Sequence, residues 1–555
     1  MALAFVFGSC HPTLYGPLAK SSRPKLVVMI VIDQFPTWTF EKQKALFTGG
    51  LARLLREGAY IPAAELPYAN TFTAASHATI ATGAPPRVHG IVGDSWWRRG
   101  EQRERPAEYD PDSPLLRVGA PGGKDPKPED AAASAKALRV EGVADVLRAA
   151  TGGRAHSVAI ALKARSAVLM AGQHPDLAVW YEPAGGGMTT SKAYAAEPPR
   201  WLVNLAETHP ASHYFGATWT PRDPALLAKF TGIPDDAPGE SADLGLGRAF
   251  PHPIAAEDPE HALLHTPFGD ELVMTTIAAA LDALELGKDD VPDLLAVSFG
   301  AHDFAGHAWG PDSWEVVDLT LRLDTALGQM FDALDARLGK GNWAVVLTSD
   351  HGATPLVERA RIRSARRISP KEIEKAAETA LVRQLGPGPW VAKLSADNLY
   401  LTPQFGELPA GVTHDAALAA AAHAMEAVPG VAVAGASERF AAGCDNVKDL
   451  DRAICLALVP GEAGELYAFP TAGSTVGDRP TGTNHDAPFE DNRHVPLLAM
   501  GPGIPHTTST GTLLQIAPTL AALLGVPPPR EAHELPLFGL RPAPPPAPAT
   551  AASPK

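Results

Sequence analysis

Short apolar runs recur along the chain and alternate with longer amphipathic stretches. Five runs are rich in aliphatic and β-branched residues and have the length of buried strands: Leu26–Ile32, Ser157–Leu162, Leu294–Phe299, Ala344–Leu347 and Val495–Met500. Helix-like stretches lie between them, among them Gly142–Ala150, Glu271–Glu285 and Val316–Leu338. This alternation predicts an α/β fold with buried parallel strands, in which helices cover both faces of a central, mostly parallel β-sheet.

Two regions interrupt this alternation, at about residues 100–135 and 354–478. They are rich in proline, glycine and charge, or carry helices of their own. We expect them to be insertions that cap the sheet edge and the cleft beside it, within one catalytic domain spanning residues 23–540. The Pro/Ala-rich residues 541–555 have the composition of a disordered tail.

The first 22 residues have some features of an export segment. A short apolar run, Ala2–Gly8, leads into Phe7-Gly8-Ser9-Cys10, which is similar to an imperfect lipoprotein cleavage box, but no Lys or Arg precedes it. We expect a signal or lipoprotein segment, with Cys10 as a lipid anchor and a periplasmic or otherwise exported protein. A frayed cytosolic N-terminus is the alternative. No later stretch is long and apolar enough to cross a membrane.

Charge and cysteine content narrow the partners. The formal net charge is −15, which argues against binding to a nucleic-acid backbone. A small anionic substrate remains compatible with it, because a metal site can reverse the local field. Besides Cys10 there are only Cys444 and Cys455, which form either a disulfide or two buried thiols. The sequence carries no signal for oligomeric state.

Acids and histidines follow three of the predicted strands. Asp33 comes directly after the first, Asp303 and His307 follow the strand that ends at Phe299, and Asp350 and His351 follow Ala344–Leu347. Each acid alone has the ordinary interpretation of a helix N-cap. Ligands of open α/β sheets bind beyond the carboxyl ends of the strands, so the three together predict one site. The loop Gly-Thr-Asn-His485-Asp supplies a further imidazole.

The spacing of these groups suits two divalent cations. On a helical turn, Asp303 and His307 point the same way and can share an ion. Three carboxylates and three imidazoles give three ligands to each of two ions. Mixed nitrogen and oxygen ligands favour zinc, with manganese or iron as alternatives. Two ions held about 4 Å apart stabilise the attacking and leaving oxygens of phosphoryl transfer.

A candidate nucleophile lies in the segment from Asn70 to Gly83. It predicts a loop entering a helix that Gly83 ends, with Thr73 at the helix N-terminus, where backbone N–H groups favour a phosphate. A hydroxyl bound to a metal there becomes a nucleophile. The alternative is a simple helix cap.

A Lys and an Arg stand two residues apart in Leu162-Lys163-Ala-Arg165. In extended chain they face the same way, so they are predicted to bind the non-bridging oxygens of a phosphate. Two solvated charges are the alternative.

Together these motifs resemble one known family. Asp33, Thr73-Ala-Ala-Ser-His, Lys163-Ala-Arg165, Asp303-Phe-Ala-Gly-His307, Asp350-His351-Gly and Gly-Thr-Asn-His485 occur in the order found in the type I phosphodiesterase/nucleotide pyrophosphatase branch of the alkaline phosphatase superfamily. The sequence is most similar to PafA-like bacterial alkaline phosphatases with a threonine nucleophile. The resemblance covers roughly residues 25–538.

The resemblance implies roles for these residues. Asp303, His307 and His485 would hold one Zn²⁺, and Asp33, Asp350 and His351 the other, with Thr73 coordinating the second ion and forming a phosphothreonine intermediate. The Lys-x-Arg pair goes with phosphate monoesters in this branch, so small-molecule phosphate monoesters are the expected substrates.

One position departs from the family pattern. The family has Gly-Asn-x-Trp, whose Asn donates to a phosphoryl oxygen, whereas this chain has Gly93-Asp94-Ser95-Trp96. An ionised Asp94 accepts hydrogen bonds only and would repel the phosphoryl group. It could pair with Lys163 or Arg165, turn away, or mark a different substrate. The alternatives to a monoesterase are therefore a phosphodiesterase or nucleotide pyrophosphatase on the same scaffold, and a catalytically inactive metal- or phosphate-binding protein.

Overall fold

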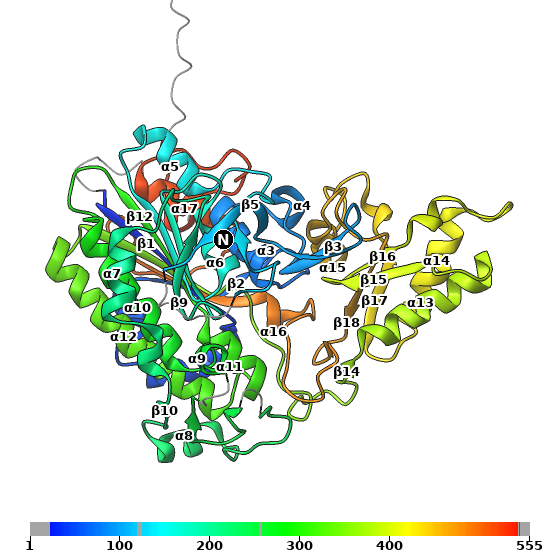
Figure 1. Cartoon of the computed structure of the whole chain (residues 1–555), viewed down its shortest axis with the longest axis horizontal. Helices are drawn as coiled ribbons and strands as arrows, with labels where there is room; N and C mark the ends of the chain where they lie inside the picture. Colours follow the sequence, from blue (N-terminus) through cyan, green and yellow to red (C-terminus); the bar gives the residue numbers. More distant parts are fainter. Residues whose placement is uncertain (1–22, 119–124, 243–244, 255–257, 542, 544–555) are drawn as a thin grey trace, which may run out of the picture.

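A computed structural model describes residues 23–118, 125–242, 245–254, 258–541 and 543. Within them the main sheet has ten strands in the order β2-β20-β13-β1-β12-β7-β8-β9-β5-β6 (Figure 1). Their bounds are β1 Leu26–Ile32, β2 Ala59–Glu65, β5 Tyr109–Leu116, β6 Ala132–Ala133, β7 Ser157–Ala161, β8 Leu177–Glu182, β9 Gly187–Ser191, β12 Asp293–Phe299, β13 Trp343–Thr348 and β20 His494–Met500.

The centre of this sheet is parallel. Strands β13, β1, β12, β7 and β8 pair in parallel, and every residue of β1 and β12 is buried. Strands covered on both faces are continuous apolar runs, which is why the sequence shows them clearly. The prediction of a parallel strand at Val495–Met500 is wrong in direction. Strand β20 is antiparallel to both β13 and β2, and a buried apolar run does not encode strand direction.

Helices cover both faces of the sheet, as predicted. Alternate residues of β1 point to opposite sides: Val27, Met29 and Val31 contribute to one core and Leu26, Val28 and Ile30 to the other. The first core packs under α3 Thr73–Thr82, α5 Val143–Thr151, α6 Ala164–Ala171 and α17 Ile516–Leu524. The second packs under α1 Thr37–Gln43, α2 Gly50–Glu57, α10 Pro267–Ala283, α11 Ala301–Trp309 and α12 Trp314–Leu338.

A second, smaller sheet projects from one end of the molecule (Figure 1). Its strand order is β15-β16-β18-β17, and it shares a separate apolar core with α13 and α14. The bounds are β15 Val391–Ser395, β16 Asn398–Leu401, β17 Val431–Ala436, β18 Leu466–Pro470, α13 Pro370–Leu385 and α14 His414–Glu426. This unit falls within residues 354–478, whereas β5 and β6, within residues 100–135, extend the main sheet.

Short elements complete the described chain. They are the helices α4 Pro86–His89, α7 Arg200–Thr208, α8 Pro224–Thr231, α9 Pro259–Leu263, α15 Asp449–Ala457 and α16 Glu490–Arg493, and the strands β3 Ser95–Arg98, β4 Arg103–Pro106, β10 Thr218–Trp219, β11 His252–Pro253, β14 Arg367–Ile368 and β19 Thr475–Val476. None of the helices in the described ranges has the length and apolar character needed to span a bilayer.

The two downstream cysteines form a disulfide. Cys444 and Cys455 are bonded across 11 positions of sequence, and both sulfur-bearing residues are buried. Of the two alternatives left open by the sequence, the structure has the bridge. Cys10, the rest of residues 1–22 and nearly all of the tail 541–555 lie outside the described residues.

Candidate active site

The predicted nucleophile begins a buried helix. Thr73 is the first residue of α3, which ends at Gly83 in the left-handed conformation with φ 70°. Both boundaries match the prediction. The Thr73 Oγ atom lies 3.3 Å from Nε2 of His351, and the Ala74 N–H in the first turn donates to Asp94 Oδ1 at 2.8 Å. The Thr73 hydroxyl and the positive end of the α3 dipole therefore face the same region, between His351 and Asp94.

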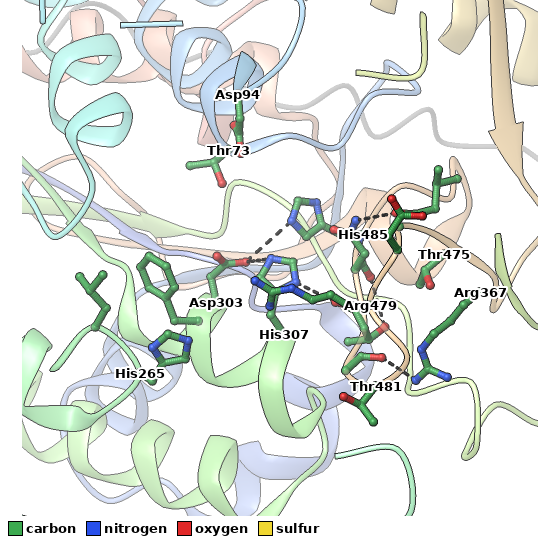
Figure 2. Close-up of a pocket in the computed structure, with 18 of the residues that line it drawn as sticks. Thr73, Asp94, His265, Asp303, His307, Arg367, Thr475, Arg479, Thr481 and His485 are labelled. Carbon is green, nitrogen blue, oxygen red and sulfur yellow. Dashed lines mark hydrogen bonds and ion pairs between the residues drawn. The ribbon is translucent and has the colours of Figure 1, made fainter. Parts of the chain in front are cut away.

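The acids converge because their strands are neighbours. Strands β13, β1 and β12 lie side by side, and Asp350, Asp33 and Asp303 follow their respective carboxyl ends. Asp303 and His307 lie one turn apart on α11, with His307 Nε2 3.1 Å from Asp303 Oδ1. His485 joins them from a loop, with its Nε2 3.8 Å from the same oxygen (Figure 2).

Backbone carbonyls orient all three imidazoles. The Nδ1 atoms of His307, His351 and His485 lie 2.8, 2.9 and 2.6 Å from the carbonyl oxygens of Thr483, Gly352 and Thr71. Each Nδ1 must carry the proton to donate to a carbonyl, so in the neutral ring Nε2 is the nitrogen that faces the site and can bind a metal. Metal-binding histidines are typically held in this way.

The donor atoms form two groups that share one histidine. Asp33, Asp350 and His351 offer ligand atoms within 4.8 Å of one another, and so do Asp303, His351 and His485. The first group is the ligand set that the resemblance implies for one ion. The second group contains His351, where the resemblance implies His307. His307 is not in this group, but its Nε2 contacts Asp303, which is.

The electrostatics of these groups call for cations. Burial and the neighbouring Asp350 raise the pKa of Asp33 well above its ordinary value. Asp33 Oδ1 and Asp350 Oδ2 are buried and accept no hydrogen bond within the described part of the chain. Burial, with His351 and His307 nearby, lowers the pKa of His485 well below its ordinary value and keeps this imidazole neutral. Crowded carboxylates beside neutral imidazoles fit divalent metal ions.

The Lys163 and Arg165 side chains contact different carboxylates. Lys163 has extended backbone, but α6 begins at Ala164, so the chain turns between the two residues. Lys163 Nζ lies 2.7 Å from Asp33 Oδ2 and 2.5 Å from Asp303 Oδ2. Arg165 Nε lies 3.3 Å from Asp94 Oδ2. Of the three alternatives for Asp94, the structure shows pairing, and the partner is Arg165.

A cleft of about 880 Å³ opens over these groups. Thr73, Asp94 and Arg165 line it together with Asp303, His307 and His485. The opposite wall is the segment from Thr475 to His485, which carries Arg479 and Thr481, with Arg367 behind it (Figure 2). The wall is fastened to α11, because Thr483 N–H donates to the His307 carbonyl at 3.0 Å and receives the His307 Nδ1 bond on its own carbonyl.

Comparison with known proteins assigns the family. The profile of the type I phosphodiesterase/nucleotide pyrophosphatase family matches residues 27–404. The chain belongs to this family. It is 32% identical over 337 residues to alkaline phosphatase PafA of Elizabethkingia meningoseptica and 33% identical over 338 residues to alkaline phosphatase PhoV of Synechococcus elongatus. Each of these matches spans 60% of this chain and 60% of the relative.

Longer matches support the same family and its fold. Alkaline phosphatase PhoK of a Sphingomonas species is 28% identical over 524 residues, which cover 92% of this chain and 89% of the relative. The crystal structure of wild-type PafA matches with a TM-score of 0.84 and 26% identity, over 93% of this chain and 99% of that one. The alkaline phosphatase fold expected from the sequence is thereby confirmed.

Two further residues of this family member contact the site and were not predicted. Gln34, at φ 60°, donates its side-chain amide to Asp303 Oδ1 at 2.6 Å and its backbone N–H to Asp350 Oδ1 at 3.1 Å. His77, four residues after Thr73 on α3, places Nδ1 2.8 Å from the Thr73 carbonyl and 3.3 Å from Asp350 Oδ2. The i,i+4 spacing from Thr73 is a sequence signal for His77.

Gln34 also explains a glycine on α11. A Cβ atom at Gly306 would lie 2.0 Å from Gln34 Oε1, so a larger residue would push this amide out of its present position. Gly306, in Asp303-Phe-Ala-Gly-His307, thus leaves space for the Gln34 amide that donates a hydrogen bond to Asp303.

Proposed function

We propose that this chain is an alkaline phosphatase-type hydrolase that cleaves phosphate monoesters at a two-metal centre, with Thr73 as the nucleophile. The observation that carries the proposal is the position of the Thr73 hydroxyl. It lies at the N-terminus of α3, 3.3 Å from an imidazole shared by two groups of acid and histidine ligands. Membership of the family and the similarity to PafA and PhoV support this activity.

In the proposed reaction, Thr73 Oγ attacks phosphorus in line with the departing alcohol. The Oγ–P bond forms as the ester P–O bond breaks. The Thr73 hydroxyl proton passes to water, and the alcohol leaves with a proton from water. Water then attacks the phosphothreonine, the P–Oγ bond breaks, and inorganic phosphate and the Thr73 hydroxyl are released. The N–H groups of the first α3 turn favour the negative charge of the phosphoryl group throughout.

The proposed ligands are those implied by the resemblance. Asp33, Asp350 and His351 would hold one divalent ion, and Asp303 with His307 and His485 the other; mixed nitrogen and oxygen donors favour Zn²⁺. Two ions held by these residues would lower the pKa of the Thr73 hydroxyl and neutralise charge on the transferring group. His307, His351 and His485 contribute by holding their protonated Nδ1 on carbonyls.

Lys163 and Arg165 are proposed to bind the phosphoryl oxygens. In the structure both side chains contact carboxylates, which favour their positive charge. Burial lowers the pKa of Lys163, but the charges of Asp303 and Asp33 outweigh it and raise this pKa above its ordinary value. Lys163 would bind the substrate oxygens once divalent ions held by Asp33 and Asp303 compensated the charge of these carboxylates. Arg165 must leave Asp94 to do the same.

A phosphodiesterase or nucleotide pyrophosphatase is the second candidate, and Asp94 favours it. The carboxylate of Asp94 already occupies the Ala74 N–H and the Arg165 guanidinium. A diester carries one negative charge where a monoester carries two, so it is repelled less by this carboxylate.

We also propose that the protein is exported. The Cys444–Cys455 disulfide favours an oxidising compartment. A lipid anchor at Cys10 would be compatible with export and is tested by labelling cells with a radioactive fatty acid.

A paired assay tests the function. Purified protein is given p-nitrophenyl phosphate and bis-p-nitrophenyl phosphate at about pH 8, with added zinc and after chelation. Faster, chelator-sensitive turnover of the monoester is expected. Faster cleavage of the diester would replace the monoesterase by the diesterase, and no turnover of either compound by metal-loaded protein would leave an inactive binding protein.

A further inference from the structure

A second cavity, of about 420 Å³, adjoins the cleft at Arg165. Arg165, His261, Leu264 and Phe304 line both spaces. Glu108, in the turn between β4 and β5, lines this second cavity, which we call the Glu108 pocket. Because Arg165 is the proposed phosphoryl ligand, a substrate bound to it could place its alcohol portion in this pocket.

The Glu108 pocket is acidic although it adjoins a phosphate site. Seven carboxylic acids and three lysine or arginine side chains line it, together with His261. Two of the three bases, Lys163 and Arg165, point their charged groups at Asp33, Asp303 and Asp94. Negative charge therefore dominates the pocket itself. Such a surface repels a second phosphate or carboxylate and attracts a cation.

Glu108 and Glu182 are the buried acids of this set, and Glu182 accepts the backbone N–H groups of Ala184 and Gly185. Glu108 is 9% exposed, lies in the turn before β5 and lines the pocket. Its Oε2 atom is buried and has no hydrogen-bond partner among the described residues. Burial raises the pKa of Glu108 to about 7, and the charge of Arg165 opposes this shift. A buried carboxylate oxygen without a partner is costly, and a positively charged donor in the pocket would satisfy it.

The other walls favour an organic cation over a metal ion. Leu162, Leu264, Phe304 and Trp180 contribute apolar surface to the pocket. Aromatic and aliphatic walls suit an alkylammonium group, whose carbon atoms gain from burial. Moreover, the only groups of acid and histidine side chains found close enough to share an ion in the described part of the chain are the two around Thr73, and neither includes Glu108.

We propose that the Glu108 pocket binds the alcohol portion of the substrate and selects phosphate esters whose alcohol carries an ammonium group. The inference rests on the proposed phosphatase function and names its substrate class. Phosphate would be held by Arg165 at the mouth of the pocket, and the ammonium would donate to Glu108 Oε2 inside it.

Two substrates of nearly equal size test the proposal. 2-Aminoethyl phosphate and propyl phosphate differ by an ammonium in place of a methyl group, and release of inorganic phosphate gives kcat/KM for each. The wild-type protein is expected to prefer the ammonium ester, and Glu108→Gln should reduce the ratio of the two kcat/KM values by about tenfold or more. Because the intrinsic reactivity of the two esters cancels when the ratios of wild type and variant are compared, the change reports the contact with Glu108.

Glu129→Gln is the matched control, because Glu129 lines the same pocket but is half-buried. Its effect on the ratio should not exceed a few-fold, as for exposed charges. If the ratio of kcat/KM values fell equally in both variants, the preference would come from the overall negative charge of the pocket and not from a contact with Glu108. An unchanged ratio in Glu108→Gln would overturn the proposal.

Binding provides a readout that does not need turnover. Calorimetry with ethylammonium should show an affinity for wild type that falls about tenfold in Glu108→Gln, with equal metal content in both proteins. If Glu108→Gln lost a metal ion, the pocket would be a metal site, and the proposal that it binds an ammonium group would be refuted. Failure of wild type to hydrolyse p-nitrophenyl phosphate would instead refute the phosphatase function, while the calorimetry still decides the pocket.

Discussion

Replacing Asp94 by Asn should make the protein a better phosphatase. In the structure Asp94 accepts the Ala74 N–H through one oxygen and pairs with Arg165 through the other, at 2.8 and 3.3 Å. An ionised monoester needs the same two donors. An Asn side chain keeps an acceptor for Ala74, releases Arg165 and adds an N–H for the phosphoryl group.

The magnitude follows from Coulomb's law. At about 5 Å, one charge on Asp94 and one on the phosphoryl group repel by about 0.8 to 3 kcal/mol for dielectric constants between about 80 and 20. The Asp94 and Arg165 side chains are 29% and 28% exposed, so solvent screening favours the lower part of this range, at about 1 kcal/mol per charge. A dianionic monoester then gains about 2 kcal/mol, or about 30-fold in kcat/KM, and a monoanionic diester about fivefold.

The assay measures kcat/KM of wild type and Asp94→Asn for p-nitrophenyl phosphate and bis-p-nitrophenyl phosphate. Asp290→Asn removes the same charge from a side chain that is 94% exposed, and it should change neither value. An unchanged or lower kcat/KM for the monoester in Asp94→Asn, or an equal gain for both esters, would refute the electrostatic reasoning.

Three further outcomes are expected. Thr73→Ala should lower turnover by about a thousandfold or more at unchanged metal content, measured by elemental analysis, because six other ligands remain; retained activity would reassign the nucleophile. Treatment with a chelator should abolish turnover and zinc should restore it; turnover that survives proven loss of metal would contradict the two-metal centre. Cys444→Ser with Cys455→Ser should lower the free energy of unfolding by about 2–4 kcal/mol in urea titrations, and a reducing agent should destabilise wild type but not this double variant.

The sequence predicts the core of this fold well because burial leaves a pattern. Strand β1 has the predicted bounds, and β12 and β13 differ from the predictions by one residue or two. The direction of β20 was predicted wrongly, since the same apolar run suits a parallel or an antiparallel neighbour. The small sheet with α13 and α14 was beyond prediction in detail, because pairing between β17 and β18 depends on contacts distant in sequence.

For the site, residue type and position after a strand were sufficient to bring together Asp33, Asp303 and Asp350. The ion-pair partners of the two basic residues were not predictable in the same way. Lys163 and Arg165 were expected to face one phosphate; in the structure α6 begins between them and each contacts different carboxylates, so their joint contact with phosphate stays a prediction. Gln34 was missed because its role depends on a positive φ and on a glycine one helix away, and no local pattern reports either.

The double hydrogen bond between Thr483 and His307 has a consequence for protein engineering. The wall of the cleft, from Thr475 to His485, carries the candidate metal ligand His485 and is hydrogen-bonded through Thr483 to the backbone carbonyl and the imidazole of His307. If the proposed function holds, substrate range and metal binding would therefore depend on one segment of the chain. A transplanted segment that shifts Thr483 would move the His307 and His485 imidazoles together, so exchanges of this segment between relatives should stop before Gly482 to preserve the proposed metal ligands.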